Sequence, residues 1–337
     1  MKMAERSILT DSIDEAASIY GAYDANITLI EDKFGVKVYN RSGEIVVNGD
    51  ADSAEKACLA INYLRKLIQL GENVTEQKTE YVISMISDGQ ASELDAFTGD
   101  CICITAKGKP IKAKTVGQKK YVEMIKKNTV VLGVGPAGTG KTFLAVAMAV
   151  SALRRKEISR IILTRPAVEA GEKLGYLPGD LQNKIDPYLR PLYDALYETM
   201  GAEGYARNVE KGIIEVAPLA YMRGRTLDDS FIILDEAQNT TSEQMKMFLT
   251  RLGVNSKAVV TGDLTQTDLP YGKISGLAQA IKILEGIEDI GIHKFTEKDV
   301  VRHRLVQKII LAYEKHGREA AAAARSSDRK TYKRVTN

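Results

Sequence analysis

The chain begins with short apolar blocks whose periodicity switches between that of strands and that of helices. The pattern predicts a strand, two helices, two strands and a third helix, at residues 7–9, 13–20, 25–34, 36–39, 44–48 and 53–70. Along the third helix, Ala57, Ile61, Leu64 and Ile68 recur on one face. This succession predicts a small α+β domain over residues 1–72.

The order of these elements resembles that of a KH-type nucleic-acid module, in which the loop between the first two helices reads Gly-x-x-Gly. The corresponding residues here are Gly21-Ala22-Tyr23-Asp24. Such a loop grips a nucleotide backbone through close glycine approach and bare N–H groups, and a carboxylate in it should repel phosphate. Two interpretations stay open: a KH-like fold with a weakened or lost RNA grip, and a structural or docking domain.

Beyond a connecting segment at residues 73–114, apolar strands alternate with helices. Strands are predicted at residues 129–134, 160–164, 212–216, 231–234, 257–261 and 290–295. Most of these runs are apolar throughout, as is typical of strands buried on both faces. The alternation predicts an α/β domain over residues 115–316, with a mainly parallel sheet covered by helices on both sides. Residues 317–337 are predicted to form a basic flexible tail.

A glycine-rich loop connects the first strand of this domain to an apolar helix at residues 142–154. Its sequence, Gly135-Pro136-Ala137-Gly138-Thr139-Gly140-Lys141-Thr142, fits the pattern G-x-x-x-x-G-K-[ST] in full. Backbone N–H groups in such a loop cradle a β-phosphate, together with the helix N-terminus. Lys141 would reach the β and γ oxygens, and Thr142 would offer its hydroxyl to Mg²⁺. A mere glycine-rich turn is disfavoured, because motif and context agree.

Two further strands end in polar residues. The strand at residues 231–234 runs into Asp235 and Glu236, and the strand at residues 257–261 runs into Gly262-Asp263-Leu264-Thr265-Gln266. Ligands of parallel sheets bind at this carboxyl edge. Asp235 would hold Mg²⁺ through water, and Glu236 would deprotonate a water that attacks the γ-phosphate. Asp263 and Gln266 lie in a loop of the kind that senses the γ-phosphate.

Together these motifs resemble the PhoH-like ATPases. The resemblance covers roughly residues 110–316 and also rests on Gly117-Gln118, Tyr121, Thr164-Arg165-Pro166-Ala167-Val168, Arg223-Gly224-Arg225-Thr226 and Asp299-Val300-Val301-Arg302-His303. The KH-like part is similar to that of the longer bacterial members. The resemblance implies one RecA-like P-loop NTPase domain of the superfamily 1 helicase type, with ATP and Mg²⁺ as cofactors. It also implies that Gln118 reads the adenine edge through one donor and one acceptor.

A phosphoryl-transfer site of this type needs an extra cation opposite the γ-phosphate, and a single RecA-like domain has no second domain to supply it. The resemblance places Arg302 where helicases carry an arginine finger. We therefore expect Arg302 to act across a subunit interface in a homo-oligomeric ring, and the resemblance suggests a hexamer. The alternative for Arg302 is a solvated helix face.

The predicted site residues form three sets. The nucleotide would be bound by Gly135, Pro136, Ala137, Gly138, Thr139, Gly140, Lys141, Thr142, Phe143 and Gln118. Mg²⁺ would be held by Thr142 and Asp235, and catalysis would involve Glu236, Lys141, Gln266 and Arg302. Arg165, Arg223 and Arg225 could hold either the nucleotide or an RNA backbone. Tyr176 could stack on a base or be packed.

The motifs lead to two function hypotheses. In the first, an ATP hydrolase couples turnover to the remodelling of single-stranded RNA. In the second, a nucleotide-gated adaptor switches a partner such as an RNA-processing endoribonuclease, and the KH-like domain is the docking surface. A small-molecule kinase is disfavoured, because Glu236 beside Asp235 suits hydrolysis and no acceptor-binding lid is evident.

The composition indicates the cellular compartment but does not indicate a binding partner. The 47 basic residues against 44 acidic ones leave a net charge of +3, too small to predict a polyanion partner from field strength. Three cysteines and the lack of a long apolar segment favour a soluble, cytoplasmic protein without a membrane span. His293, His303 and His316 have no partners at metal-ligand spacing. Met245 and Met247 are most simply core or interface residues.

Overall fold

The structure is a computed structural model that describes residues 3–70, 72–95, 101–166, 181–270, 272–302, 305, 306 and 309. The chain divides into two compact units, Met1–Val300 and Val301–Asn337. Tyr176, His303, His316 and the predicted tail at residues 317–337 lie outside the described residues. Arg302 belongs to the second unit, and the first unit contains the predicted N-terminal domain and residues 115–300 of the predicted α/β domain.

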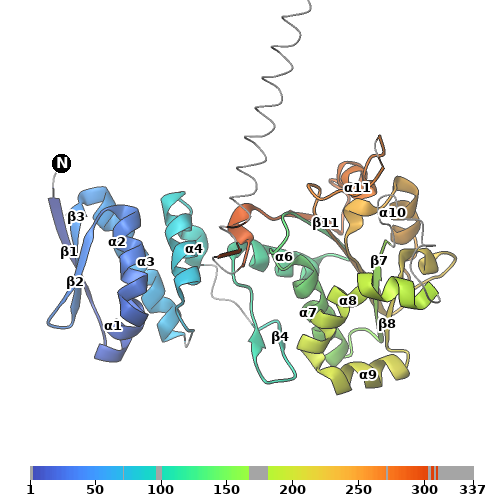
Figure 1. The fold of residues 1–337 in the computed structure, drawn as a ribbon, viewed down its shortest axis with the longest axis horizontal. Coiled ribbons are helices and arrows are strands. Elements are labelled where there is room, and N and C mark those ends of the chain that lie inside the picture. The colour runs from blue at the N-terminus through green and yellow to red at the C-terminus, as the bar shows by residue number, and fades with distance from the viewer. Residues whose placement is uncertain are drawn as a thin grey trace, which may run out of the picture. The chain divides into compact units, whose positions relative to one another are not determined.

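The N-terminal domain has the predicted order of elements. A three-stranded antiparallel sheet, in the order β1-β3-β2, carries helices on one face (Figure 1). Its strands are β1 (Met3–Leu9), β2 (Lys37–Arg41) and β3 (Glu44–Asp50). Its helices are α1 (Ile13–Tyr20), the short turn η1 (Ala22–Asp24), α2 (Ala25–Phe34) and α3 (Ala51–Gln69).

Two further helices complete the core of this domain. They are α4 (Glu76–Ser87) and α5 (Ala91–Asp95), which fall within the segment predicted to be a connection. Val82 and Leu94 are buried in the same apolar cluster as Ile30 of α2. The buried Thr79 hydroxyl of α4 donates to Asn26 Oδ1 of α2 over 3.0 Å. The helical packing of this domain therefore extends to α5.

The second domain is built on a six-stranded, wholly parallel sheet in the order β11-β6-β10-β9-β7-β8, which confirms the predicted α/β architecture. The strands are β6 (Val130–Val134), β7 (Arg160–Arg165), β8 (Ile214–Pro218), β9 (Ser230–Leu234), β10 (Lys257–Gly262) and β11 (Ile290–Lys294). A small hairpin, β4 (Cys103–Ile104) and β5 (Pro110–Ile111), precedes them.

Helices cover both faces of the parallel sheet (Figure 1). On one face lie α6 (Val116–Lys127), α7 (Lys141–Arg154) and α8 (Leu181–Met200), with α9 (Ala202–Glu210) packed on α8 and β8. On the other face lie α10 (Ser242–Leu249) and α11 (Gly276–Leu284). Met245 is buried in the second cluster and Met247 packs against it, which confirms the prediction that these methionines fill a core. Short 3₁₀ turns are η2 (Leu219–Met222), η3 (Ala237–Asn239) and η4 (Glu297–Asp299).

The strand order decides which loops meet. Strands β6, β10, β9 and β7 are direct neighbours and parallel, so their carboxyl ends lie side by side at one edge of the sheet. The glycine-rich loop, the Asp235-Glu236 pair, the Asp263 loop and Arg165 all sit at these four ends. No helix in the part of the chain that the structure describes is long and apolar enough to span a membrane.

Candidate nucleotide-binding and catalytic site

The glycine-rich loop leaves β6 through a backbone conformation that only glycine adopts readily. Gly135 has φ 152°, and a Cβ built there would lie 2.6 Å from Cβ of Phe295. The Lys141 ammonium donates to the carbonyl oxygens of Gly135 and Pro136 over 2.7 and 2.8 Å. The lysine is therefore held over the loop whose N–H groups would receive phosphate. Phe143, in the first turn of α7, is half-buried against the core on that face of the sheet.

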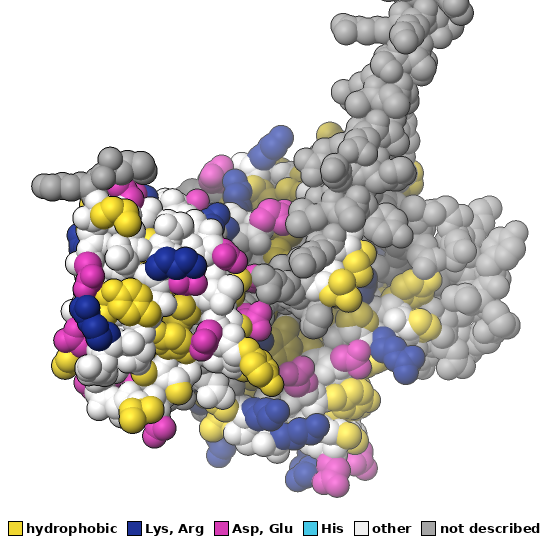
Figure 2. All heavy atoms as spheres, turned by 60° about the vertical axis from the view of Figure 1, so that its left-hand side comes forward, with side chains coloured by type: hydrophobic (Ala, Val, Ile, Leu, Met, Phe, Trp, Pro, Cys, Tyr) yellow, Lys and Arg dark blue, Asp and Glu magenta, His cyan; other side chains and the backbone are white. Residues whose placement is uncertain are grey.

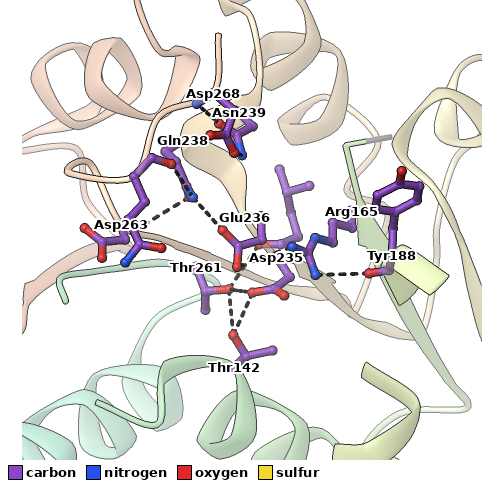
Figure 3. A network of polar contacts seen from close by, with 12 residues as sticks. Thr142, Arg165, Tyr188, Asp235, Glu236, Gln238, Asn239, Thr261, Asp263 and Asp268 are labelled. Atoms are coloured by element: carbon purple, nitrogen blue, oxygen red, sulfur yellow. Dashed lines mark hydrogen bonds and ion pairs between the residues drawn. The ribbon is translucent and has the colours of Figure 1, made fainter. Parts of the chain in front are cut away.

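Three side chains from three elements meet below the loop. Asp235 Oδ1 accepts a hydrogen bond from the Thr142 hydroxyl over 2.6 Å and one from the Thr261 hydroxyl over 2.8 Å (Figure 3). Asp235 is buried, and its backbone N–H donates to Thr164 O over 2.9 Å. Hydroxyl and carboxylate oxygens are the ligands that Mg²⁺ prefers. Thr142 and Asp235 thus fit the predicted metal ion, and Thr261 orients the carboxylate.

Glu236 follows with its backbone in the left-handed region, at φ 51°. This conformation is uncommon for a residue with a side chain, and such residues cluster at functional sites. One carboxylate oxygen lies 3.5 Å from the Arg165 guanidinium, and the other accepts a hydrogen bond from Gln238 Nε2. The side chain is 35% exposed, whereas Asp235 beside it is buried. The two acids therefore differ: Asp235 is enclosed and bonded to hydroxyls, and Glu236 can be reached by water.

The loop after β10 is bound to both of the preceding motifs. Asp263 Oδ2 accepts from the Ala137 N–H of the glycine-rich loop over 3.1 Å. Its other oxygen accepts from the Thr265 N–H and hydroxyl over 3.0 and 2.7 Å. Gln266 is exposed, and its carbonyl oxygen accepts from Gln238 Nε2 over 3.1 Å. A displacement of this loop would therefore change the positions of groups in the glycine-rich loop and of groups next to Glu236.

Gln118 lies in the first turn of α6, against the glycine-rich loop. Its Nε2 donates to Thr139 O over 3.0 Å, and its Oε1 accepts from the Lys114 N–H over 2.6 Å. A carboxamide has two N–H donors and two acceptor lone pairs, so these two bonds use one of each. That Gln118 also reads an adenine stays a prediction.

Tyr121 lies one turn further along α6, over Gly133 of β6. A Cβ at Gly133 would come within 2.6 Å of the tyrosine ring, so only glycine leaves room for it. Burial raises the pKa of Tyr121 well above its usual value, and the nearby Asp235 carboxylate raises the pKa further. Tyr121 therefore stays neutral beneath the site.

The candidate arginines fall into different settings. Arg165 at the end of β7 donates to Tyr188 O over 3.0 Å and faces Glu236. Arg225 forms a two-pronged ion pair with Glu215 of β8, at 2.6 and 2.7 Å, so its guanidinium is already engaged by the protein. Arg223 is exposed. Arg302 lies in the second compact unit, and its predicted role stays a prediction.

The comparisons with known proteins agree with this geometry. A family model described as PhoH-like protein matches residues 110–314 of the chain. The chain belongs to this family. A PhoH-like protein of Bacillus subtilis is 52% identical over 302 residues, which cover 90% of this chain and 95% of the relative. A PhoH-like protein of Synechocystis is 44% identical over 327 residues, 97% of this chain and the whole of that relative. Protein PhoH of Escherichia coli is 48% identical over 206 residues, 60% of this chain and 58% of that protein.

As a PhoH-like chain, the protein carries a P-loop ATPase-like fold in which the predicted motifs gather at one sheet edge. Neither Thr261 nor Gln238 is among the site residues predicted from the sequence. Both side chains bind the acidic pair directly. The sequence pattern that indicated this region was the polar residues at the ends of apolar strands. That pattern does not show which side chains form hydrogen bonds with one another.

Proposed function

We propose that the protein is an Mg²⁺-dependent ATPase that hydrolyses ATP to ADP and phosphate and couples turnover to the remodelling of single-stranded RNA. The observation that carries the hydrolase part is the contact of the Thr142 hydroxyl with Asp235, with Glu236 next in the chain. A phosphate cradle, an enclosed acid and a water-accessible acid then lie together. This arrangement suits attack by water better than transfer to a bulky acceptor.

Each group has a distinct task in the proposed mechanism. The N–H groups of the loop at Gly135–Thr142 and the Lys141 ammonium would hold the β- and γ-phosphates. Thr142 and Asp235 would hold Mg²⁺, which supplies neutralisation of phosphate charge when bound. Glu236 would take the proton of the attacking water. Gln266, on the exposed loop after β10, would contact the γ-phosphate side of the nucleotide.

The decisive experiment compares two single variants by calorimetry and by phosphate release. We expect Lys141→Ala to lose nucleotide affinity, because the cation that meets the phosphates is removed. We expect Glu236→Gln to keep affinity and to lose about 10²-fold or more in turnover, the usual contribution of a general base. Equal hydrolysis by Glu236→Gln and the wild type would remove Glu236 from its catalytic role.

Coupling to RNA is supported by the basic side chains near this edge. Arg165 contacts Glu236, so an RNA strand that bound Arg165 would change the surroundings of the proposed base directly. Arg223 is exposed on the loop after η2. Single-stranded RNA should therefore stimulate ATP turnover, and its binding should weaken as salt is raised, because phosphate contacts release counterions. Turnover that ignores RNA at every salt concentration would contradict the coupling.

We further propose that Arg302 completes the site of a neighbouring subunit in a homo-oligomeric ring, with a hexamer as the arrangement to test. The support is the family resemblance and the need for one more cation opposite the γ-phosphate. Mixing Arg302→Ala subunits with Glu236→Gln subunits should restore part of the activity, because some interfaces then contain both intact groups. Assembly mass is measured on the same samples, and a lack of rescue at every ratio counts against a shared site.

A second candidate function is a nucleotide-gated adaptor, and the N-terminal domain favours it. Asp24, which stands in place of the last glycine of the KH loop, has φ 57°, and Tyr23 before it is fully exposed. Acidic and basic side chains are interspersed over the face of this domain that Figure 2 shows. Their electrostatic potentials largely cancel, so this face attracts a polyanion only weakly. In this reading, ATP turnover ignores RNA and responds to an endoribonuclease partner.

A further inference from the structure

We infer that Gln238 is a positioning residue that couples the Glu236 carboxylate to the loop carrying Asp263 and Gln266. The inference rests on the proposed hydrolysis of ATP and adds a residue to it. Gln238 would touch neither nucleotide nor water, and it would act through Glu236. The structure assigns it this role through three hydrogen bonds and a close-fitting site.

The Gln238 side chain is buried, at 1% exposure, between the turn after β9 and the loop after β10. Its Nε2 donates to the Glu236 carboxylate and to Gln266 O, the latter over 3.1 Å (Figure 3). Its Oε1 accepts from the Asp263 N–H over 3.0 Å. Both amide hydrogens and the carbonyl oxygen are therefore in use, which is the satisfaction that a buried polar group requires.

The site also has the shape of this carboxamide. A Cβ on Gly262 would come within 2.8 Å of Gln238 Oε1 and within 2.5 Å of a Leu277 methyl group. Glycine at this last position of β10 therefore lets the amide reach the strand end. An apolar side chain at position 238 would leave the buried Asp263 N–H without its acceptor and the Gln266 carbonyl without this donor, which destabilises the site.

The consequence lies in how the proposed base is oriented. One oxygen of Glu236 faces Arg165 and the other accepts from Gln238, so the carboxylate is held from two sides. Asp263 and Gln266 are the residues predicted to sense the γ-phosphate, and both bind Gln238 through their backbones. A movement of their loop would therefore be transmitted to the Glu236 carboxylate through the Gln238 side chain.

The test is Gln238→Glu, which keeps the size and shape of the side chain. It replaces the donor to Glu236 by a second carboxylate and leaves the glycine-rich loop untouched. We expect ATP affinity within about threefold of the wild type, and a fall in kcat of about 10-fold or more, as for loss of one charge-assisted hydrogen bond. We also expect KM for ATP and the stoichiometry of ATP binding to stay at their wild-type values while kcat falls, which places the loss in the chemical step and not in the fraction of folded protein.

Asn239→Asp is the matched control. Asn239 is the next residue of the same turn and is also buried, and it makes two bonds with Asp268, at 3.2 and 2.8 Å. The exchange again places a carboxylate against a carboxylate. The Asn239 N–H donates to the Glu236 backbone carbonyl over 3.0 Å, but the Asn239 side chain bonds Asp268 and not the Glu236 carboxylate. We expect the exchange to lower thermal stability without lowering kcat.

The outcomes separate cleanly. A kcat of Gln238→Glu equal to that of the wild type, or the same fall in kcat in Asn239→Asp, would overturn the inference. Should Gln238→Glu fail to fold, Gln238→Asn keeps the amide and withdraws it by one methylene, and wild-type kcat in that variant also overturns it. Wild-type protein without Lys141-dependent ATP turnover would instead refute the proposed function itself.

Discussion

Asp235 is held by two hydroxyl groups, one from the phosphate-binding loop and one from the neighbouring strand. Thr261 supplies the second, over 2.8 Å, and a hydrogen bond to a charged group contributes about 1.5–3 kcal/mol. Thr261→Val keeps the shape of the side chain and removes this bond. We expect the Mg²⁺ concentration at half-maximal ATP turnover to rise roughly tenfold or more.

The control for this prediction is Thr250→Val. Thr250 is exposed, and its hydroxyl donates to carbonyl oxygens of its own helix, Lys246 O and Met247 O. The same chemical change there should leave the Mg²⁺ dependence at its wild-type value. If both valine variants titrate like the wild type, Thr261 does not orient the metal-binding carboxylate.

His293 of β11 illustrates a pH effect at the scale of one side chain. Burial lowers its pKa from 6.5, against the opposing influence of Asp299 and with a smaller lowering by Lys120. The folded state therefore favours the neutral ring, while the unfolded chain takes up a proton below about pH 6.5. The stability contributed by His293 is present above that pH and is lost as pH falls.

We expect the wild-type melting temperature to fall more steeply between about pH 7.5 and pH 5.5 than that of His293→Phe. Phenylalanine suits the position because the imidazole packs against Phe295 and Tyr121, with ring centroids 4.5 and 5.7 Å apart. Thermal melts in a series of buffers at constant ionic strength supply the two slopes. Parallel slopes would show that another group carries the acid sensitivity.

At the scale of elements, the packing of α6 on β6 depends on a missing side chain. Tyr121 lies over Gly133, where a Cβ would approach the ring to 2.6 Å. We expect Gly133→Ala to cost about 1–3 kcal/mol by overpacking and to weaken ATP binding, because α6 also carries Gln118. Adding Tyr121→Leu should recover part of both losses. Urea denaturation of the two single variants and the double variant measures this coupling, and strict additivity would contradict the proposed clash.

Much of the element pattern could be predicted because its signals are local. The bounds predicted for α1 and α2 are those observed, since Ser12 caps the start of α1 through the Glu15 N–H and Gly35 ends α2 at φ 67°. The glycine-rich loop could also be predicted, because its strand, loop and helix are contiguous in the sequence. The strands of the parallel sheet were found as apolar runs, with ends that differ by one or two residues.

What could not be predicted depends on strand order and on distant partners. Nothing local states that β10 lies between β6 and β9, which is what brings Thr261 to Asp235. Gln238 binds the loop at Gln266, far along the chain, and Arg225 is paired with Glu215 rather than left for a ligand. The packing of α4 on the N-terminal core was likewise hidden, because the bond between Thr79 and Asn26 joins segments far apart in sequence.

At the scale of the whole first unit, the N-terminal domain helps to build the start of α6. The Val116 N–H donates to the Tyr81 hydroxyl of α4 over 2.7 Å, and the Val116 side chain is buried in the N-terminal core. Burial raises the pKa of Tyr81 to about 12, so the hydroxyl stays protonated at physiological pH. Lys298 of η4 lies 2.6 Å from Asp88 at the end of α4. Two residues after Val116 comes Gln118, which contacts the phosphate loop.

We expect Tyr81→Phe to lower ATP affinity by roughly 2- to 10-fold, because one hydrogen bond is worth about 0.5–1.5 kcal/mol and the Val116 N–H loses its partner. Calorimetric titration with ATP and Mg²⁺ measures the change. Tyr39→Phe is the control, since Tyr39 lies partly exposed on β2, away from α6. Equal affinity of the two variants and the wild type would mean that this bond does not support the nucleotide site.

The bond between Tyr81 and Val116 also has a consequence for whatever ligand the N-terminal domain recognises. If that ligand shifts α4, it changes the free energy of ATP binding by way of α6 and Gln118, without approaching the nucleotide. Linkage then requires the reverse effect at the same strength: saturating ATP must change the dissociation constant of the ligand by the same factor. Screening for ligands of the N-terminal domain with and without ATP would therefore reveal both the ligand and the sign of its influence.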